Sequence, residues 1–257
     1  EIVFGDWSSD VCSSDLYTPG FVNIPYNDTA ALENALKDPD VAGFLVEPIQ
    51  AEAGVYVPED GFLAKAATLC KKYRVLLIAD EVQTGLARTG KMLACDHEQV
   101  RPDILVLGKA LSGGTYPVSC VLADDEVMLT IKPGEHGSTY GGNPMAAAVS
   151  MAALDVIREE NLAGNAEKMG EIFRSEMRAI RSGMIETVRG KGLLNAVAID
   201  ASHPVSAWEI CLKMKENGII AKPTHEHIIR FTPPLVITEN QMEDALTRIK
   251  KAFRESG

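Results

Sequence analysis

VLLIADEVQTGLARTG, at residues 75–90, and RPDILVLGKALSGG, at residues 101–114, each contain a short apolar run that ends on a charged residue. VLLIA is followed directly by Asp80, and ILVL is followed, after one glycine, by Lys109. Continuous runs of β-branched and aliphatic residues are typical of parallel strands that are buried on both faces. Ligands of open α/β sheets bind just beyond the carboxyl ends of such strands. The stretch therefore predicts a carboxylate and an amine at the same edge of one sheet.

An amine and a carboxylate placed in this way are the two groups that pyridoxal phosphate chemistry requires. We expect Lys109 to be partly desolvated where it leaves its strand, which would lower the pKa of the amine and make it a competent nucleophile. It would hold the cofactor aldehyde as a Schiff base, while Asp80 would keep the pyridine nitrogen protonated. Taken alone, Lys109 is also compatible with a solvated lysine, and Asp80 with a turn cap. A phosphate-binding loop at Lys109 is excluded, because the upstream glycine and the following Ser or Thr of that motif are missing.

The composition is that of an ordinary globular chain with a sizeable core, since 46% of its 257 residues are hydrophobic and 24% are charged. The net charge of −11 argues against nucleic acid or an anionic membrane as a partner. No apolar run approaches the roughly 20 residues of a membrane span. Five cysteines without a C-x-x-C pair indicate a reducing compartment, and no residue pattern predicts a metal site.

Residues 1–16 differ from the rest, because GDWSSDVCSSDL repeats Ser-Ser-Asp and carries no helical or strand period. They lack the charged and apolar regions of a secretory signal. We therefore expect them to be a foreign or disordered leader, and the rest to be the C-terminal part of a longer protein. Alternating strands and helices then predict a parallel α/β layer over residues 17–144, with strands at residues 41–46, 75–79, 104–107 and 118–122.

The pattern changes near residue 145, which predicts a smaller α+β domain at residues 145–257. Asn143 as a cap and Pro144 at the first helical position indicate a long helix. Thr238 opens a capping box before the last helix. Further helices are expected near residues 163–181 and 205–216, and strands near residues 187–189, 193–199, 219–221 and 228–231.

The segments ADEVQTGLARTG and LGKALSGG together resemble the class III aminotransferases of fold type I. The resemblance covers roughly residues 17–257. It implies the fold of pyridoxal-phosphate-dependent transferases, N-terminally truncated, with a parallel-rich sheet, covering helices and a smaller C-terminal domain. It assigns the covalent attachment of the cofactor and the transfer of the substrate proton to Lys109, and the pyridinium contact to Asp80.

The same resemblance implies further cofactor contacts. Gln83 would bind the ring hydroxyl, and Ser138 and Thr139 the phosphate, with Thr139 reaching the neighbouring subunit of a homodimer. Spacing alone favours a simple turn for Ser138 and Thr139 and a surface role for Gln83. Glu81 competes with Asp80, but adjacent strand residues point in opposite directions, so only one can face the cofactor.

Glu52 and Arg230 are implied to form a substrate switch. Arg230 lies in the apolar run IIRFTPPL, where an arginine requires a carboxylate partner. By resemblance, Glu52 holds Arg230 away from one substrate and releases it to bind the carboxylate of the other, while Glu47 supports the site. Ala51 stands where the family commonly has glycine, so a positive φ there would strain the loop.

Within the family, KPGEHGSTYGGNP and PTHEHIIRFTPPL are most similar to the enzymes that use ornithine as amino donor. The implied reaction passes the δ-amino group to 2-oxoglutarate, in the mitochondrial matrix or the cytoplasm. Two alternatives stay open: a class III enzyme for acetylornithine or 4-aminobutyrate, and an inactive α/β binding or dimerisation module. We expect the main phosphate loop, the stacking aromatic ring and a second substrate arginine upstream of Tyr17.

Overall fold

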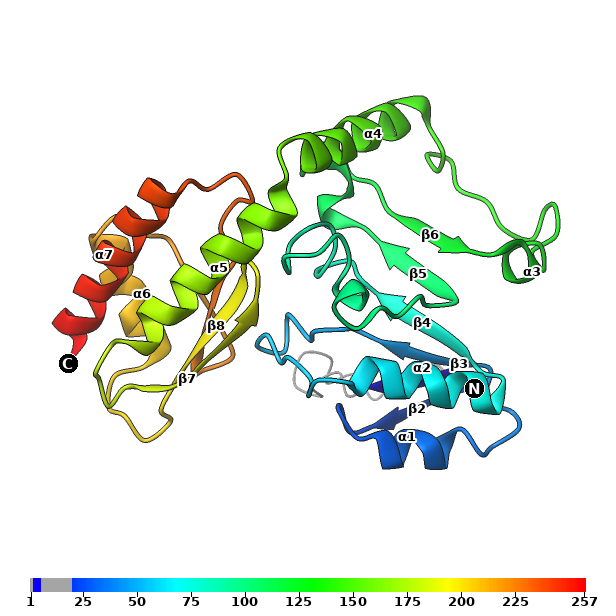
Figure 1. Ribbon diagram of the computed structural model, residues 1–257, viewed down its shortest axis with the longest axis horizontal. Helices are drawn as coiled ribbons and strands as arrows, with labels where there is room; N and C mark the ends of the chain where they lie inside the picture. Colours follow the sequence, from blue (N-terminus) through cyan, green and yellow to red (C-terminus); the bar gives the residue numbers. More distant parts are fainter. Residues whose placement is uncertain (1, 6–19) are drawn as a thin grey trace. The chain divides into compact units, whose positions relative to one another are not determined.

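The computed structural model describes residues 2–5 and 20–257 (Figure 1). Its contacts divide the chain into two compact units. The first unit takes its described residues from Glu1–Pro48, Pro58–Leu86 and Leu93–Glu159, and the second unit comprises Ile49–Val57, Ala87–Met92 and Glu160–Gly257.

This division differs from the expected boundary between residues 144 and 145. Helix α4 (Pro144–Glu159) belongs to the first unit, because it packs on the 3₁₀ helix η2 (Lys109–Ser112). Two short internal segments, Ile49–Val57 and Ala87–Met92, belong to the second unit. Such exchanges depend on tertiary contacts, which a local sequence pattern does not report.

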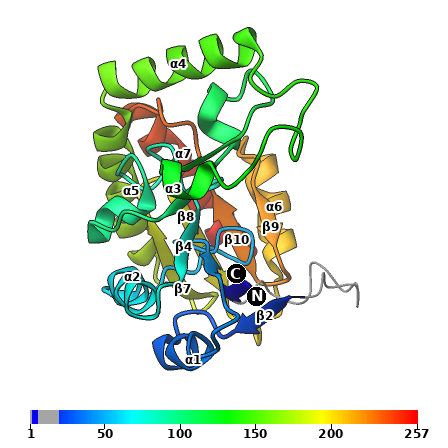
Figure 2. The same ribbon diagram turned by 90° about the vertical axis from the view of Figure 1, so that its right-hand side faces the viewer.

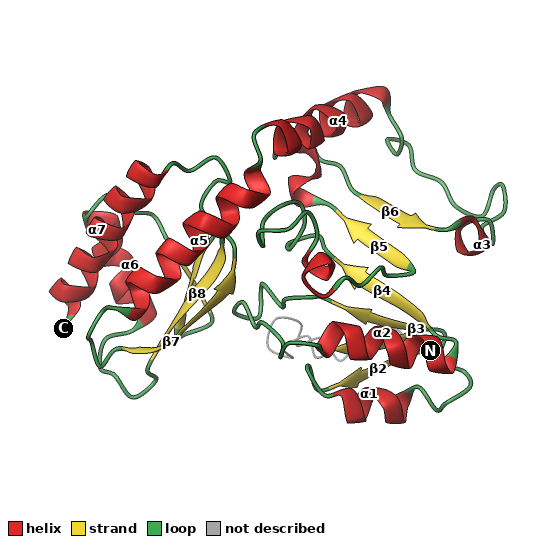
Figure 3. Ribbon diagram, viewed as in Figure 1, coloured by secondary structure: helices red, strands yellow, loops and turns green. Residues whose placement is uncertain are grey.

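A six-stranded sheet forms the centre of the first unit, in the order β2-β1-β3-β4-β5-β6 (Figure 3). Its strands are β1 (Ile2–Gly5), β2 (Phe21–Ile24), β3 (Gly43–Val46), β4 (Leu76–Asp80), β5 (Ile104–Leu107) and β6 (Cys120–Ala123). The neighbours from β2 to β5 pair in parallel, whereas β6 pairs with β5 antiparallel. The expected parallel direction of this last strand is therefore wrong. A parallel pair needs a crossover of a dozen or more residues, usually a helix, whereas only η2 stands between β5 and β6.

Strand β1 lies within residues 1–16, which were expected to be a foreign or disordered leader, so this expectation is wrong for residues 2–5. Ile2–Gly5 pairs with both β2 and β3, so these four residues belong to the sheet. A run of four apolar residues is too short to reveal its structure by periodicity, and its place is set by the neighbouring strands. Residues 6–16 of the expected leader lie outside the described residues.

Helices α1 (Thr29–Ala35) and α2 (Phe62–Tyr73) pack with the sheet of the first unit in one apolar cluster. Asp28 caps α1, since its side chain accepts hydrogen bonds from the N–H groups of Ala30 and Ala31. The cluster includes Leu32, Phe44, Leu63, Ala66, Leu77 and Ala79. It holds β3 and β4 in place up to the edge where the polar residues follow.

The remaining helices of the first unit are η1 (Ala94–Glu98), α3 (Asp125–Met128) and the long, uninterrupted α4 (Figure 2). The predicted start of α4 is confirmed, because the Asn143 side chain accepts a hydrogen bond from the Ala146 N–H at 2.9 Å. None of the helices in the described part of the chain has the length and apolar character needed to cross a membrane.

The second unit contains a four-stranded antiparallel sheet in the order β7-β8-β10-β9. Its strands are β7 (Ile185–Lys191), β8 (Leu194–Ile199), β9 (Lys222–Thr224) and β10 (Ile228–Phe231), and its helices are α5 (Leu162–Arg178), α6 (Ala207–Glu216) and α7 (Glu239–Ser256). The predicted capping box at Thr238 is confirmed. The strand expected at residues 219–221 is wrong, because pairing with β10 places β9 at residues 222–224 instead.

Different partners cover the two faces of this second sheet. Val188, Val197 and Ile229 form one cross-strand row and pack with α5, α6 and α7. On the opposite face, Leu194, Ala196 and Ala198 of β8 pack against Ile49, Ala51 and Val55. These last residues belong to the hairpin 49–57, which is closed by two hydrogen bonds between Gln50 and Tyr56. Strand β8 is consequently buried over its whole length.

Candidate active site

Asp80 is the last residue of β4 and is half-buried at the carboxyl edge of the first sheet. Its Oδ1 accepts a hydrogen bond from the Val82 N–H at 3.0 Å. Within the described residues, its Oδ2 accepts none. Asp80 therefore keeps one carboxylate oxygen open for a ligand.

Glu81 is hydrogen-bonded to η1, which decides whether Asp80 or Glu81 is able to face a ligand at the sheet edge. Its side chain is buried and accepts hydrogen bonds from the N–H groups of Ala94 at 2.9 Å and Cys95 at 2.8 Å, and from the Thr84 hydroxyl. Burial and the proximity of Glu81 raise the pKa of the Cys95 thiol. Glu81 thus anchors η1, so that of these two acids only Asp80 remains available for a ligand.

Lys109 follows β5 and begins η2. Asp80 is the register partner of Val106, so Asp80 and Lys109 lie at the carboxyl ends of adjacent parallel strands. The φ of Lys109 is +40°, a backbone conformation that L side chains rarely adopt and that concentrates at functional sites. Its side chain is exposed, which corrects the expected partial desolvation. The turn carries the amine past the apolar layer that ends at Leu107.

Glu47 occupies the same sheet edge on the next strand. It directly follows Val46, whose register partner is Ala79, and its side chain is half-buried. The Tyr26 hydroxyl donates to the carbonyls of Glu47 at 3.2 Å and Pro48 at 3.0 Å. Burial, followed by the charges of Glu47 and Glu98, raises the pKa of Tyr26, so this donor stays protonated. The neutral phenol holds the chain where it leaves β3.

The other predicted cofactor residues lie in turns of the first unit. Gln83 lies in the turn after β4 and is half-buried. Ser138 and Thr139 are exposed in the loop before α4, where the Ser138 hydroxyl accepts a hydrogen bond from the Gly141 N–H at 2.9 Å. The turn that spacing favours is therefore present, and the cofactor roles of these three residues stay predictions. Among residues 2–5 and 20–257, no group of His, Cys, Asp and Glu is arranged to hold a metal ion.

Glu52 and Arg230 meet inside the second unit. Arg230 Nη1 donates to Glu52 Oε2 at 2.7 Å and to the Ala51 carbonyl at 3.3 Å. The side chain of Arg230 is 22% exposed and that of Glu52 is 48% exposed, so solvent reaches the pair. The predicted pairing of these two residues is confirmed, whereas its role as a switch stays a prediction.

Ala51 does not carry the backbone strain that its place in the sequence suggested. It is fully buried against β8, and the positive φ values of this hairpin fall on Gly54 and Val55. A methyl side chain therefore fits at position 51 without a left-handed backbone.

Sequence reasoning missed two residues that hold the hairpin 49–57. The Thr224 hydroxyl donates to the Glu52 carbonyl at 2.9 Å, and Arg189 Nε donates to the Gly54 carbonyl at 2.9 Å. Arg189 also lies over the Tyr56 ring, 4.2 Å from its centroid. In the sequence, Arg189 is marked only as a charged residue next to the apolar Val188 of a strand. Such alternation is ordinary for an antiparallel sheet with one solvent-exposed face.

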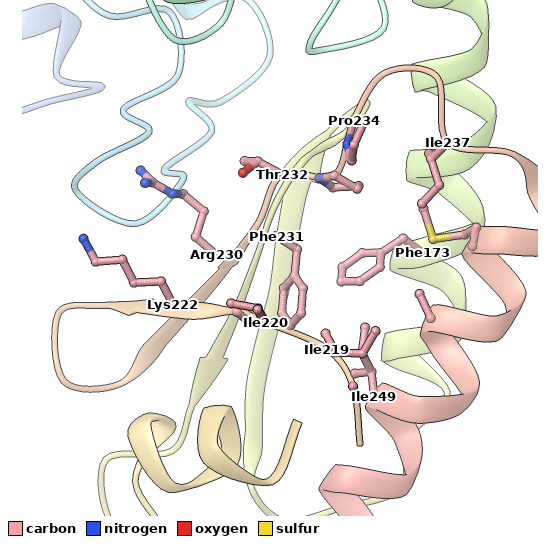
Figure 4. Close-up of a pocket in the computed structure, with 15 residues that line it drawn as sticks. Phe173, Ile219, Ile220, Lys222, Arg230, Phe231, Thr232, Pro234, Ile237 and Ile249 are labelled. Atoms are coloured by element: carbon pink, nitrogen blue, oxygen red, sulfur yellow. The ribbon is translucent and has the colours of Figure 1, made fainter. Parts of the chain in front are cut away.

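An open cavity of about 480 Å³ lies beside β10, also within the second unit (Figure 4). Its lining is mainly apolar and includes Phe173, Ile219, Phe231, Ile237 and Ile249. Arg230 and Lys222 are its charged residues, and both point away from Phe231 and Phe173. Neither Lys109 nor Asp80 lines it, so this cavity is not the candidate active site.

The model of the aminotransferase class-III family matches residues 14–253. The mitochondrial ornithine aminotransferases of Drosophila melanogaster and Rattus norvegicus are 62% and 59% identical to the chain over 237 residues, which cover 92% of the chain and 54% of each relative. The chain thus spans about half the length of the curated relatives that it matches.

Solved structures agree with this result. The ornithine aminotransferase of Toxoplasma gondii, described with partial occupancy of PLP at its active site, superposes with a TM-score of 0.96 at 47% identity, covering 100% of this chain and 64% of that one. The acetylornithine aminotransferase of Elizabethkingia anophelis superposes with a TM-score of 0.92 at 57% identity, covering 99% of this chain and 65% of that one.

Proposed function

The chain belongs to the class III aminotransferase family, and from this premise we propose that the complete protein transfers the δ-amino group of ornithine to 2-oxoglutarate, giving glutamate 5-semialdehyde and glutamate. The observation that carries the proposal is the placement of Asp80 and Lys109 at the carboxyl ends of adjacent parallel strands. The choice of ornithine is supported by relatives of that name at 51–62% identity.

The residues at the sheet edge fit pyridoxal phosphate. Lys109 presents an exposed amine for a covalent link to an aldehyde, and Asp80 keeps Oδ2 open for a protonated ring nitrogen. When bound there, the cofactor supplies an aldehyde and an electron-withdrawing ring. We assign Gln83 to the ring hydroxyl and Ser138 and Thr139 to the phosphate, with Thr139 serving the neighbouring subunit of a homodimer.

Each protein residue then has a separate task. Lys109 acts as general base and acid and moves the proton at the substrate carbon. Asp80 would hold the ring nitrogen in its charged form by a charge-assisted hydrogen bond. Glu47 supports the strand edge next to Asp80.

Glu52 and Arg230 distinguish the two substrates. Ornithine presents its reacting amine on a carbon that bears no carboxylate, so Arg230 has to be neutralised, and Glu52 does this. 2-Oxoglutarate brings a carboxylate next to its reacting carbon, which forms a bidentate pair with the guanidinium once Glu52 releases it.

A second candidate is acetylornithine as the amino donor, which the names of two solved neighbours favour. We further propose that the protein works in the mitochondrial matrix or the cytoplasm, since its relatives include proteins named as mitochondrial and others without that label.

The test compares amino donors with the purified complete protein loaded with pyridoxal phosphate. Ornithine, acetylornithine and 4-aminobutyrate are each paired with 2-oxoglutarate, and kcat/KM is measured, with Lys109→Ala as the inactive control. We expect the highest kcat/KM with ornithine and glutamate 5-semialdehyde as the product. A higher kcat/KM with acetylornithine would identify acetylornithine as the amino donor. Cofactor binding without turnover of any donor would favour an inactive binding module.

A further inference from the structure

Arg189 and Arg230 flank the same small residue on one face of the second sheet. Both are register partners of Ala196, Arg189 on β7 and Arg230 on β10. Directly paired residues of antiparallel strands project to the same face. The two guanidinium groups therefore stand on either side of Ala196, on the face that the hairpin 49–57 covers.

Each arginine holds a different part of this hairpin. Arg189 Nε donates to the Gly54 carbonyl at 2.9 Å, and its guanidinium lies 4.2 Å from the centroid of the Tyr56 ring. Arg230 donates to the Glu52 carboxylate at 2.7 Å and to the Ala51 carbonyl at 3.3 Å. The two arginines thus bind residues on both sides of the tip of the hairpin 49–57.

The two sets of contacts differ in whether a substrate carboxylate can compete with them. Arg189 binds a backbone carbonyl and an aromatic ring, for which a substrate carboxylate does not compete. Arg230 binds a carboxylate at a partly exposed position, where another carboxylate makes the same bonds. Substrate binding therefore breaks the Arg230 contact with Glu52 and leaves the Arg189 contacts in place.

The hairpin tip is closely packed around Arg189. Gly54 has a φ of +128°, and a Cβ added there would lie 2.6 Å from Ile228 Cδ1 and 3.2 Å from Arg189 Nη2. Arg189 Nη2 is buried and has no hydrogen-bond partner among the described residues. A buried unpaired donor costs free energy that an apolar side chain would avoid. The guanidinium is thus costly to the fold, and a positioning role gives a reason for it.

We infer that Arg189 is a positioning residue for the Glu52–Arg230 pair: it fixes the hairpin 49–57, so that the Glu52 side chain alone moves when Arg230 is released. The Thr224 hydroxyl adds a second fixed contact, to the Glu52 carbonyl at 2.9 Å. The inference rests on the proposed function, because it assigns a residue to the substrate switch.

The test uses Arg189→Met in the complete, cofactor-loaded protein, with Arg178→Met as the matched control. Arg178 also donates to a backbone carbonyl of β7, that of Val188, but lies on α5, and within the described residues no hydrogen bond or ion pair links it to the hairpin. Single-turnover rates with ornithine and with glutamate give a ratio of half-reactions. We expect Arg189→Met to shift this ratio toward glutamate by about tenfold, the effect of losing one charged hydrogen bond, and Arg178→Met to leave it unchanged.

Two further measurements separate positioning from general stability. Adding Arg189→Met to Glu52→Ala should shift the ratio no further, because both changes remove the same shielding. Amide hydrogen exchange should rise in residues 50–56 of Arg189→Met and not in the helices of the second unit. Arg189→Lys, which keeps the charge and a donor but loses the planar stacking, should give an intermediate shift and replaces the Met variant if that variant does not fold.

A ratio that stays at the wild-type value in Arg189→Met or Arg189→Lys would overturn the inference, even if the melting temperature fell. Additive shifts in the double variant would also overturn it. If the wild-type protein does not use ornithine, the proposed function fails separately. In that case two other measurements test whether Arg189 positions the pair: amide hydrogen exchange in the hairpin 49–57, and the affinity for glutarate, a simple dicarboxylate. Both should increase in Arg189→Met, and unchanged values would refute the positioning role.

Discussion

Arg230 Nη1 lies 2.7 Å from Glu52 Oε2, although the two residues are 178 positions apart in the sequence. Both residues belong to the second unit, where one sheet and the hairpin packed on it set their distance. A partly exposed ion pair stabilises a fold by only about 0.2–1 kcal/mol. Displacing Glu52 is therefore inexpensive, and a bidentate substrate carboxylate offers a better partner for Arg230.

Removing the carboxylate of Glu52 should change substrate preference rather than stability. Glu52→Ala removes the carboxylate partner of Arg230, so the glutamate half-reaction should speed up relative to the ornithine half-reaction. A donor that carries a carboxylate, such as 4-aminobutyrate, should also improve. Single-turnover kinetics of each half-reaction measure the effect, and equal slowing of both half-reactions would assign Glu52 a structural role only.

Asp80 and Glu81 should respond to the same chemical change in opposite ways. Asp80→Asn should leave the melting temperature nearly unchanged and cofactor bound, but slow proton abstraction by about 10²–10³-fold, as expected when an electrostatic group at the reacting centre is removed. Glu81→Gln should instead destabilise the fold by about 1–3 kcal/mol, because an amide would face the N–H donors of η1.

These two variants are measured together by single-turnover absorbance and by denaturant unfolding. Near-normal turnover in Asp80→Asn with the cofactor bound would contradict the assignment of Asp80 to the ring nitrogen. A large loss of turnover in a folded, fully stable Glu81→Gln variant would transfer the role to Glu81.

Gly170 in α5 should not tolerate alanine, although alanine is the better helix former by about 1 kcal/mol. A Cβ at Gly170 would overlap the carbonyl oxygen of Gly192, to which Arg174 Nη1 already donates at 2.9 Å. We expect Gly170→Ala to lower the free energy of unfolding by about 1–3 kcal/mol, the usual cost of overpacking.

Gly164 provides the control within the same helix. The three atoms nearest to a Cβ at Gly164 all belong to the side chain of Asn161, which is able to rotate away. Gly164→Ala should therefore be neutral or stabilising in the same unfolding experiment. Equal stability of the two alanine variants would show that the approach of α5 to Gly192 is looser than the structure indicates.

Local patterns predicted much of this fold from the sequence. The apolar run at residues 104–107 is β5, and the caps at Asn143 and Thr238 open their helices as expected. In each case the signal lies within a few neighbouring residues, where backbone hydrogen bonding and burial are decided locally.

The departures share one physical cause, which is contact between segments distant in sequence. The antiparallel β6, the strand β1 and the shift of β9 depend on pairing with strands elsewhere in the chain. The same holds for the hairpin 49–57, which packs on β8 of the second unit.

The candidate site shows the same limit. A charged residue after an apolar run located Asp80 and Lys109, and an arginine within an apolar run located Arg230. No such signal marks Arg189 or Thr224, because their task is to bind backbone carbonyls of the hairpin. The exposure of Lys109 was missed because it depends on the turn geometry of η2.

The most direct test of the central claim is to locate the covalent cofactor attachment. The complete protein is loaded with pyridoxal phosphate, reduced with borohydride, digested and mapped by mass spectrometry. The position of Lys109 beyond β5, next to Asp80, predicts that the pyridoxyl mass is found on Lys109 and is absent from the Lys109→Ala variant. A stoichiometric label on Lys91 or Lys132 instead would contradict the account.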